Sequence, residues 1–124
     1  MDNMVWQRFD NQEFSFDVEK ETPVDLYLSL RHHTNYPYDH INVNVTIETP
    51  DGEKRSREYR FNLKDKKGSW KSSGMGELWD IDLPIRKNIS FRDSGECRVI
   101  IENKMSKIHT PGILEVGLLV RKSE

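Results

Sequence analysis

The sequence contains no alanine, a single cysteine and no long run of apolar residues. Alanine is the strongest helix former and is uncommon in strands, so its absence from 124 residues favours β structure. One cysteine, Cys97, excludes an intramolecular disulfide, and its apolar surroundings predict a buried thiol that packs as a small hydrophobic group. A membrane-spanning helix needs about 18 apolar residues in succession, and no segment reaches that length.

Neither sign of charge is in marked excess. The chain has 19 basic and 21 acidic residues, interleaved along the sequence, and a net charge of −2. A nucleic-acid-binding protein would carry a strong basic excess or a basic face, so nucleic acid is excluded as a partner. The length fits one domain that can bury a core without metal or disulfide, and the ordered spacing of the apolar residues argues against disorder.

The first three residues, Met1, Asp2 and Asn3, contain neither the charged nor the apolar segment of a signal peptide. Two interpretations are open at this point. The chain is either a cytosolic protein or the mature part of an exported one.

Apolar residues recur at every second position in segment after segment. This alternation predicts strands with one dry and one wet face. We therefore predict a single all-β domain over residues 1–124, an antiparallel two-layer β-sandwich of jelly-roll-like form with about eight strands and no helix. The apolar sets are Phe14, Phe16 and Val18; Val24, Leu26, Leu28 and Leu30; Ile41, Val43, Val45 and Ile47; Tyr59, Phe61 and Leu63; Trp79, Ile81, Leu83 and Ile85; Cys97, Val99 and Ile101; and Leu114, Val116, Leu118 and Val120.

Turn-forming residues separate the predicted strands. Pro50-Asp51-Gly52 predicts a hairpin, and Asp93-Ser94-Gly95 and Pro111-Gly112 predict the turns before the last two strands. Pro84 cannot donate to a ladder, so its strand is expected to lie at a sheet edge or to break there. Gly117 inside the last strand suggests a bulge or a close backbone approach. The longest segment without a strand pattern is 64–77, and such a long loop is often functional or mobile.

The histidines raise the question of a metal site. They are His32, His33, His40 and His109, with Asp39 as a further candidate ligand. None of the spacings typical of zinc ligands occurs, and neighbouring histidines in a strand face opposite sides. Hydrogen-bonded or solvated histidines are therefore favoured over a metal site.

No catalytic motif is apparent. The sequence has no Gly-x-Ser-x-Gly elbow and no phosphate-binding glycine loop. The carboxylates of Glu77, Asp80 and Asp82 could in principle form a hydrolytic pair, but the last two share the predicted wet face and are explained by solvent exposure. We predict no enzymatic activity and no cofactor.

Aromatic side chains offer an alternative function. Tyr36, Tyr38, Trp70 and Trp79 could form a sugar-stacking platform, as in β-sandwich carbohydrate-binding modules. Trp79 falls on a dry face and is expected to pack in the core, whereas Trp70 in the glycine-rich segment is the better candidate for an exposed contact. Tyr36-Pro37-Tyr38 can equally be a rigid, packed turn.

Residues 26–38, L-Y-L-S-L-R-H-H-T-N-Y-P-Y, resemble the GldH family of gliding-motility lipoproteins of Bacteroidota. The resemblance extends over about residues 6–121, because further motifs follow in the same order and spacing. These motifs are Pro50-Asp51-Gly52, Gly68-Ser69-Trp70, Gly74-Met75-Gly76, Phe91, Gly95, Met105, and Pro111-Gly112-Ile113 leading into Val116-Gly117-Leu118. The chain departs from the family pattern at Cys97, where the family has an aromatic residue, and at Ser106, where it has arginine. Where the family contacts a partner through that arginine, we do not expect the contact here.

The resemblance implies the mature part of an exported lipoprotein, without its signal peptide and its lipid-carrying cysteine. Such a protein is anchored by lipid to a membrane of the cell envelope, the outer membrane in our reading, with its domain on the periplasmic side. It implies a non-enzymatic accessory or assembly role in gliding motility, linked to type IX secretion, with other envelope, motility or secretion proteins as partners. The candidate partner-binding surface comprises Arg31, Tyr36, Tyr38 and Trp70, and the alternative function is a carbohydrate-binding module.

Overall fold

The computed structural model describes residues 5–123, so the first three residues discussed above lie outside the described part of the chain. This part consists of strands joined by turns and loops, with no helix. The ten strands are β1 (Val5–Gln7), β2 (Gln12–Val18), β3 (Val24–His33), β4 (His40–Glu48), β5 (Lys54–Asn62), β6 (Ser73–Met75), β7 (Leu78–Ile89), β8 (Gly95–Asn103), β9 (His109–Pro111) and β10 (Ile113–Lys122).

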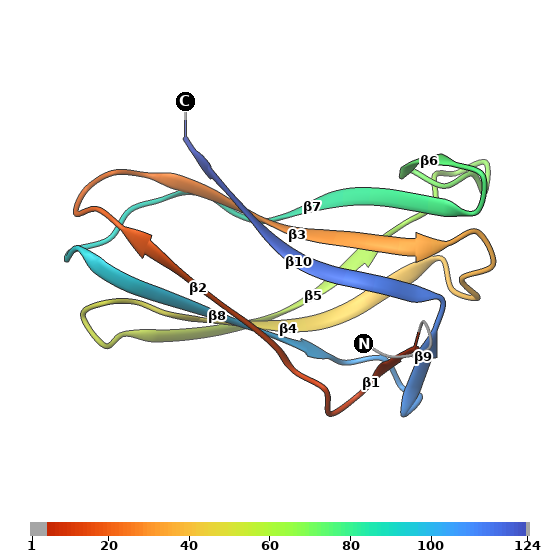
Figure 1. Ribbon diagram of the computed structural model, residues 1–124, viewed down its shortest axis with the longest axis horizontal. Helices are drawn as coiled ribbons and strands as arrows, with labels where there is room; N and C mark the ends of the chain where they lie inside the picture. The colour runs from red at the N-terminus through yellow and green to blue at the C-terminus, as the bar shows by residue number, and fades with distance from the viewer. Residues whose placement is uncertain (1–4, 124) are drawn as a thin grey trace.

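Two four-stranded sheets form the two layers of a sandwich (Figure 1). One sheet has the strand order β10-β3-β7-β6 and the other β2-β8-β4-β5, while β1 and β9 form a small separate ribbon. Every described strand pair is antiparallel. The prediction of an all-β antiparallel sandwich is confirmed, and the strand number is slightly higher than predicted.

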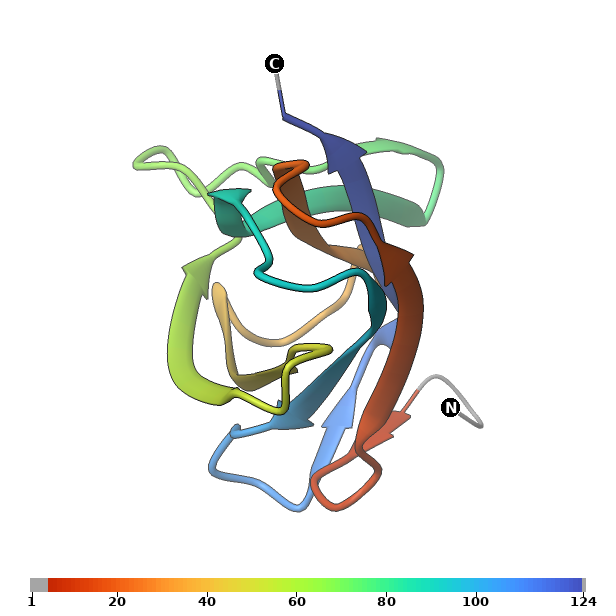
Figure 2. The same ribbon diagram turned by 90° about the vertical axis from the view of Figure 1, so that its left-hand side faces the viewer.

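The core lies between the two sheets, where the dry faces of the strands meet (Figure 2). In β4 the side chains of Ile41, Val43, Val45 and Ile47 are all buried, as the alternation predicts. Cys97 is buried as well, and burial raises the pKa of its thiol to about 11. The prediction of a structural, packed cysteine is confirmed.

Pro84 lies at a sheet edge. β7 continues through this residue, which is paired with Tyr27 of β3, and the register between the two strands shifts directly after it, where Leu26 is paired with Arg86. On the other side, β6 reaches only as far as Asp80, so among the described residues no strand faces Pro84 there. Pro84 lacks an N–H, but on this side there is no strand to which it would have donated, so no ladder hydrogen bond is lost. The prediction that its strand lies at a sheet edge is right, and the alternative that the strand ends at Pro84 is wrong.

The bulge expected at Gly117 is found elsewhere. Gly117 is in regular register with Ser29, and a methyl group at Gly117 would make only an ordinary contact, 3.6 Å from the Ser29 Cβ atom. The register shifts instead between Ile113 and Glu115. This bulge turns the side chain of Ile113 into the core, where sequence alternation placed Leu114.

The hairpin predicted at Pro50-Asp51-Gly52 joins β4 to β5, and Gly52 has the positive φ of 88° that favours glycine. The segment 64–77 is not free of strands. It contains β6, which pairs with the start of β7, and an isolated bridge between Lys64 and Trp70. The prediction of a long segment without strands is therefore wrong, because these short pairings give residues 64–77 β structure.

Candidate functional site

Arg31 is an exposed residue on the outer face of the sheet. Its Nε donates a hydrogen bond to the Asp80 carboxylate at 2.8 Å, and its Nη1 lies 3.6 Å from the Glu115 carboxylate. The hydrogen bond with Asp80 raises the pKa of the guanidinium. Arg31 thus joins β3 to both of its neighbouring strands and remains accessible to a partner.

Tyr36 is buried, with only 3% of its surface exposed. Its hydroxyl donates to the carbonyl oxygen of His40 at 2.9 Å, and burial raises its pKa. The ring of half-buried Tyr38 meets it edge-on, with ring centres 5.6 Å apart. The turn is therefore a packed one, and the Tyr36 ring offers no surface to a ligand.

Trp70 and Trp79 are both half-buried. Trp70 packs against the core, its ring 4.5 Å from the His32 ring centre and 4.5 Å from the Lys64 ammonium. Trp79 donates from its indole nitrogen to Thr34 Oγ1 at 2.6 Å. The expectation that Trp70 stands exposed is wrong, because the bridge to Lys64 folds it onto the sandwich. Tyr36 and Trp70 do not form an open stacking platform.

His32 is fully buried, next to these rings. Its Nε2 lies 2.6 Å from the Ser72 hydroxyl and its Nδ1 lies 3.1 Å from the His33 carbonyl oxygen, so both ring nitrogens have partners. Burial lowers its pKa, which favours the neutral ring. His33 faces the other way, toward Glu77 at 3.3 Å. Between residues 5 and 123, no three metal-binding side chains gather at one point.

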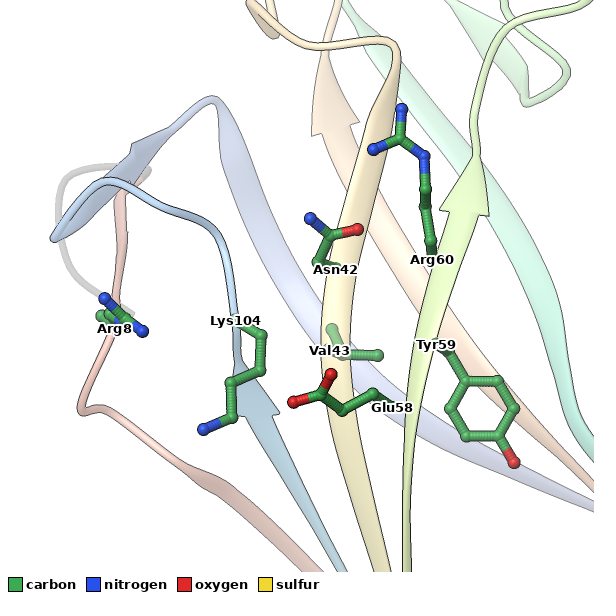
Figure 3. A pocket seen from close by; sticks show the side chains of 7 residues that line it. All are labelled: Arg8, Asn42, Val43, Glu58, Tyr59, Arg60 and Lys104. Atoms are coloured by element: carbon green, nitrogen blue, oxygen red, sulfur yellow. The ribbon is translucent and has the colours of Figure 1, made fainter.

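A groove of about 530 Å³ lies on the outer face of the other sheet (Figure 3). We call it the Arg60 groove. Figure 3 shows Arg8 and Lys104 on one side, Arg60 on the other, and Asn42 with Glu58 between them, while Tyr59 points away. The groove is lined by Arg8, Asn42, Val43, Glu58, Tyr59, Arg60 and Lys104.

Cations dominate the Arg60 groove: Arg8, Arg60 and Lys104 line it together with one carboxylate, Glu58. Lys104 lies 3.5 Å from the Glu102 carboxylate. A smaller hollow shares Arg8 and Lys104 and adds Phe9, a ring that is 83% exposed. Guanidinium, ammonium and amide groups around an open hollow suit a polar, anionic partner group.

The Arg60 groove was missed at the level of sequence. Its residues come from β4, from β5 and from the segments that follow β1 and β8, and only the fold brings them together. The available signal was the wet face of two neighbouring strands, where Asn42 is paired with Arg60 and Asn44 with Glu58. Arg31, by contrast, lies on the opposite sheet, so the predicted surface and the groove are separate.

Residues 1–120 match the family described as GldH lipoprotein. A gliding motility lipoprotein GldH homolog of Christiangramia forsetii is 26% identical over 96% of this chain and 78% of its own length. The gliding motility lipoprotein GldH of Flavobacterium johnsoniae is 22% identical over 97% of this chain and 79% of its own length. No solved structure matches the chain.

Proposed function

The chain belongs to the GldH lipoprotein family, and on that premise we propose a non-enzymatic accessory or assembly role in the gliding-motility apparatus. Family membership makes the protein a gliding-motility-associated lipoprotein, anchored to a membrane of the cell envelope. In the proposal, a lipid on an N-terminal cysteine outside this sequence holds the domain on the periplasmic side of the outer membrane. The role is linked there to type IX secretion.

The family match over residues 1–120 is the observation that carries this proposal. The Arg60 groove supports a binding role, because its cations and its amide can hold a polar partner group. Glu58 is the single carboxylate in its lining, no histidine lines it, and its one hydroxyl group, that of Tyr59, donates to the Ile85 carbonyl oxygen. The groove is thus equipped to bind.

The proposed partners are other envelope, motility or secretion proteins. Two surfaces are available to them on opposite sheets: the Arg60 groove, and the outer face of the other sheet around exposed Arg31. Arg31 already has two carboxylate neighbours, so a partner there would compete for an occupied guanidinium. The Arg60 groove is the stronger candidate for this reason.

The native gene product tests the localisation. Cells fed a labelled fatty acid are fractionated into inner and outer membranes, and the protein is probed with protease before and after the outer membrane is opened. We expect label on the protein, outer-membrane fractionation and protection in intact cells. An unlabelled product in the cytoplasmic fraction would contradict the proposal.

Deletion of the gene tests the role. We expect cells to lose movement on glass and to retain substrates of type IX secretion, and the wild-type gene to restore both. Normal movement together with normal secretion in the deletion strain would overturn the proposed role while leaving the membrane anchor intact.

A further inference from the structure

β5 is an edge strand whose backbone is open on one side. It ends the sheet order β2-β8-β4-β5, and all nine of its residues are in unbroken register with β4, from Lys54 opposite Glu48 to Asn62 opposite His40. It contains no proline and no bulge. A long, regular edge of this kind is a template on which another strand can pair.

The other sheet edges in the described part of the chain are less accessible. β6 has only three residues, and the stretch of β7 beyond it carries Pro84, which cannot donate a hydrogen bond. β10 and β2 lie side by side along the opposite flank of the sandwich (Figures 1 and 2). β5, the lime strand at the outer flank in Figure 2, is therefore the accessible edge.

β7, the nearest strand of the other sheet, forms no backbone ladder with β5. The Tyr59 hydroxyl donates to the Ile85 carbonyl oxygen at 3.0 Å, so a side chain bridges the two sheets where a ladder could have formed. No ladder joins β5 to β7 in the described sheets. The outward N–H and C=O groups of β5 are left for another chain.

The charges of β5 indicate which chain it accepts. The strand carries Lys54, Arg55, Arg57 and Arg60 against a single acidic residue, Glu58. Like charges facing each other across a strand pair are unfavourable, so a second copy of β5 is disfavoured. An acidic strand would place carboxylates opposite these cations.

Two of these four cations already pair with carboxylates of this chain, and the other two are more available to a partner. Lys54 and Arg55 already contact carboxylates, at 3.0 Å from Glu48 and 2.7 Å from Glu53. Arg57 instead lies over the Tyr59 ring, 5.2 Å from its centre, and Arg60 opens into the groove. Arg57 and Arg60 point to opposite faces of the sheet, so they can contact side chains on both faces of one added strand.

We propose that β5 binds an extended acidic segment of a partner protein as an added strand, with Arg57 and Arg60 selecting its carboxylates. Backbone pairing along Lys54–Asn62 supplies the affinity and the cations supply the specificity. The inference deepens the proposed accessory role and rests on it for the partner's identity as an envelope protein.

Synthetic nine-residue peptides test the pairing. One repeats threonine-glutamate-glutamate, which places carboxylates on both faces of an added strand, and its counterpart has lysine in place of each glutamate. Each is titrated into the 124-residue chain while amide exchange and backbone chemical shifts are followed by NMR. We expect the acidic peptide to bind in the micromolar to millimolar range and to slow exchange at alternate amides of β5, and the basic peptide to leave them unchanged.

Matched variants test the selection. We expect Arg57→Glu with Arg60→Glu to weaken binding of the acidic peptide at least tenfold. Lys66→Glu with Lys67→Glu makes the same change in net charge at two exposed residues away from β5 and should leave binding intact. Circular dichroism shows whether each variant keeps its fold, and where the double arginine variant does not, Arg57→Gln with Arg60→Gln replaces it.

Several results would overturn the inference: no binding of the acidic peptide at millimolar concentration, equal binding of both peptides, protection centred on another strand, or dimers formed through β5. Because these measurements use the isolated chain, they are independent of lipid attachment and motility. Failure of the pairing would leave the proposed accessory role standing, and failure of the role would leave the pairing standing.

Discussion

At the scale of single residues, the buried ring of His32 makes stability depend on pH. Burial lowers its pKa below the ordinary 6.5, so the unfolded chain takes up this proton at a higher pH than the folded chain does. The contribution of neutral His32 to the stability of the folded state is complete above the ordinary pKa. It is lost as pH falls toward the lowered pKa of the folded protein. We expect the urea midpoint to drop between pH 7.5 and pH 5.

The comparison for this prediction is His32→Gln, which removes the titrating group but keeps an amide near Ser72. The variant should be less stable at pH 7.5 and should show a smaller drop on acidification. The acidic residues whose pKa values are lowered, Asp25, Asp39 and Asp51, act below their ordinary pKa of 3.8 and do not enter this range. If the urea midpoints of the two proteins fell equally on acidification, His32 would not be the group responsible.

The thiol of Cys97 should be inert in the folded protein. Its pKa of about 11 leaves little thiolate at pH 8, and the side chain is inaccessible. A thiol-specific dye should react about a hundredfold more slowly than with a free cysteine. Guanidinium should restore the rate, and Ser73→Cys on the exposed strand β6 should react at once in the folded state. Rapid labelling of the folded wild type would mean that the core opens readily.

At the scale of elements, two glycines with similar backbone angles should differ in what alanine costs. Gly112, between β9 and β10, has a φ of 88° and Gly68 has a φ of 82°. Alanine at either site pays about 1–2 kcal/mol for the left-handed conformation. A methyl group at Gly112 would also lie 3.0 Å from the Tyr36 Cα atom, whereas the space at Gly68 is open. Chemical denaturation should therefore show the larger loss for Gly112→Ala, and equal losses would refute the tight contact.

The two faces of β4 should respond differently to a new carboxylate. Val43→Asp buries an unpaired charge in the core and should cost about 3–5 kcal/mol of unfolding free energy. Asn42→Asp places the charge on the wet face opposite Arg60 and should change stability by less than about 1 kcal/mol. Urea unfolding of both variants measures this, and similar losses would show that the faces are wrongly assigned.

Most of the long strands could be predicted because they bury one face, which leaves alternating apolar residues in the sequence. In β5 this alternation is confined to the end of the strand, at Tyr59 and Phe61. The short strands β1, β6 and β9 could not, since three residues are too few to show a period. Alternation also predicts which face of a strand a residue lies on, but it does not predict how far the side chain is buried. Trp79 is on the predicted face yet half-buried, and Trp70, outside any predicted strand, packs against the core.

At the scale of the whole molecule, the candidate site was less predictable than the fold. Arg60 and Asn42 could be assigned to a wet face, but their meeting with Arg8 and Lys104 depends on which strands become neighbours. That choice is made by long-range pairing, such as β4 with β8 and β1 with β9, and carries no local signature. Arg31 could be proposed from the sequence because it belongs to a recognisable motif, and it lies exposed on the outer face of its sheet.

The arrangement of β3 between β7 and β10 also sets the order in which the protein can fold. The leucines of β3 appear early in synthesis, but one of its two neighbours is the last strand to be made. Asn103 likewise bonds to the carbonyl of Trp6, ninety-seven positions earlier in the chain. Pairings of such long range form slowly and only once both ends are present. The sandwich can therefore be completed only when almost the entire chain is available, whatever strands have paired before then.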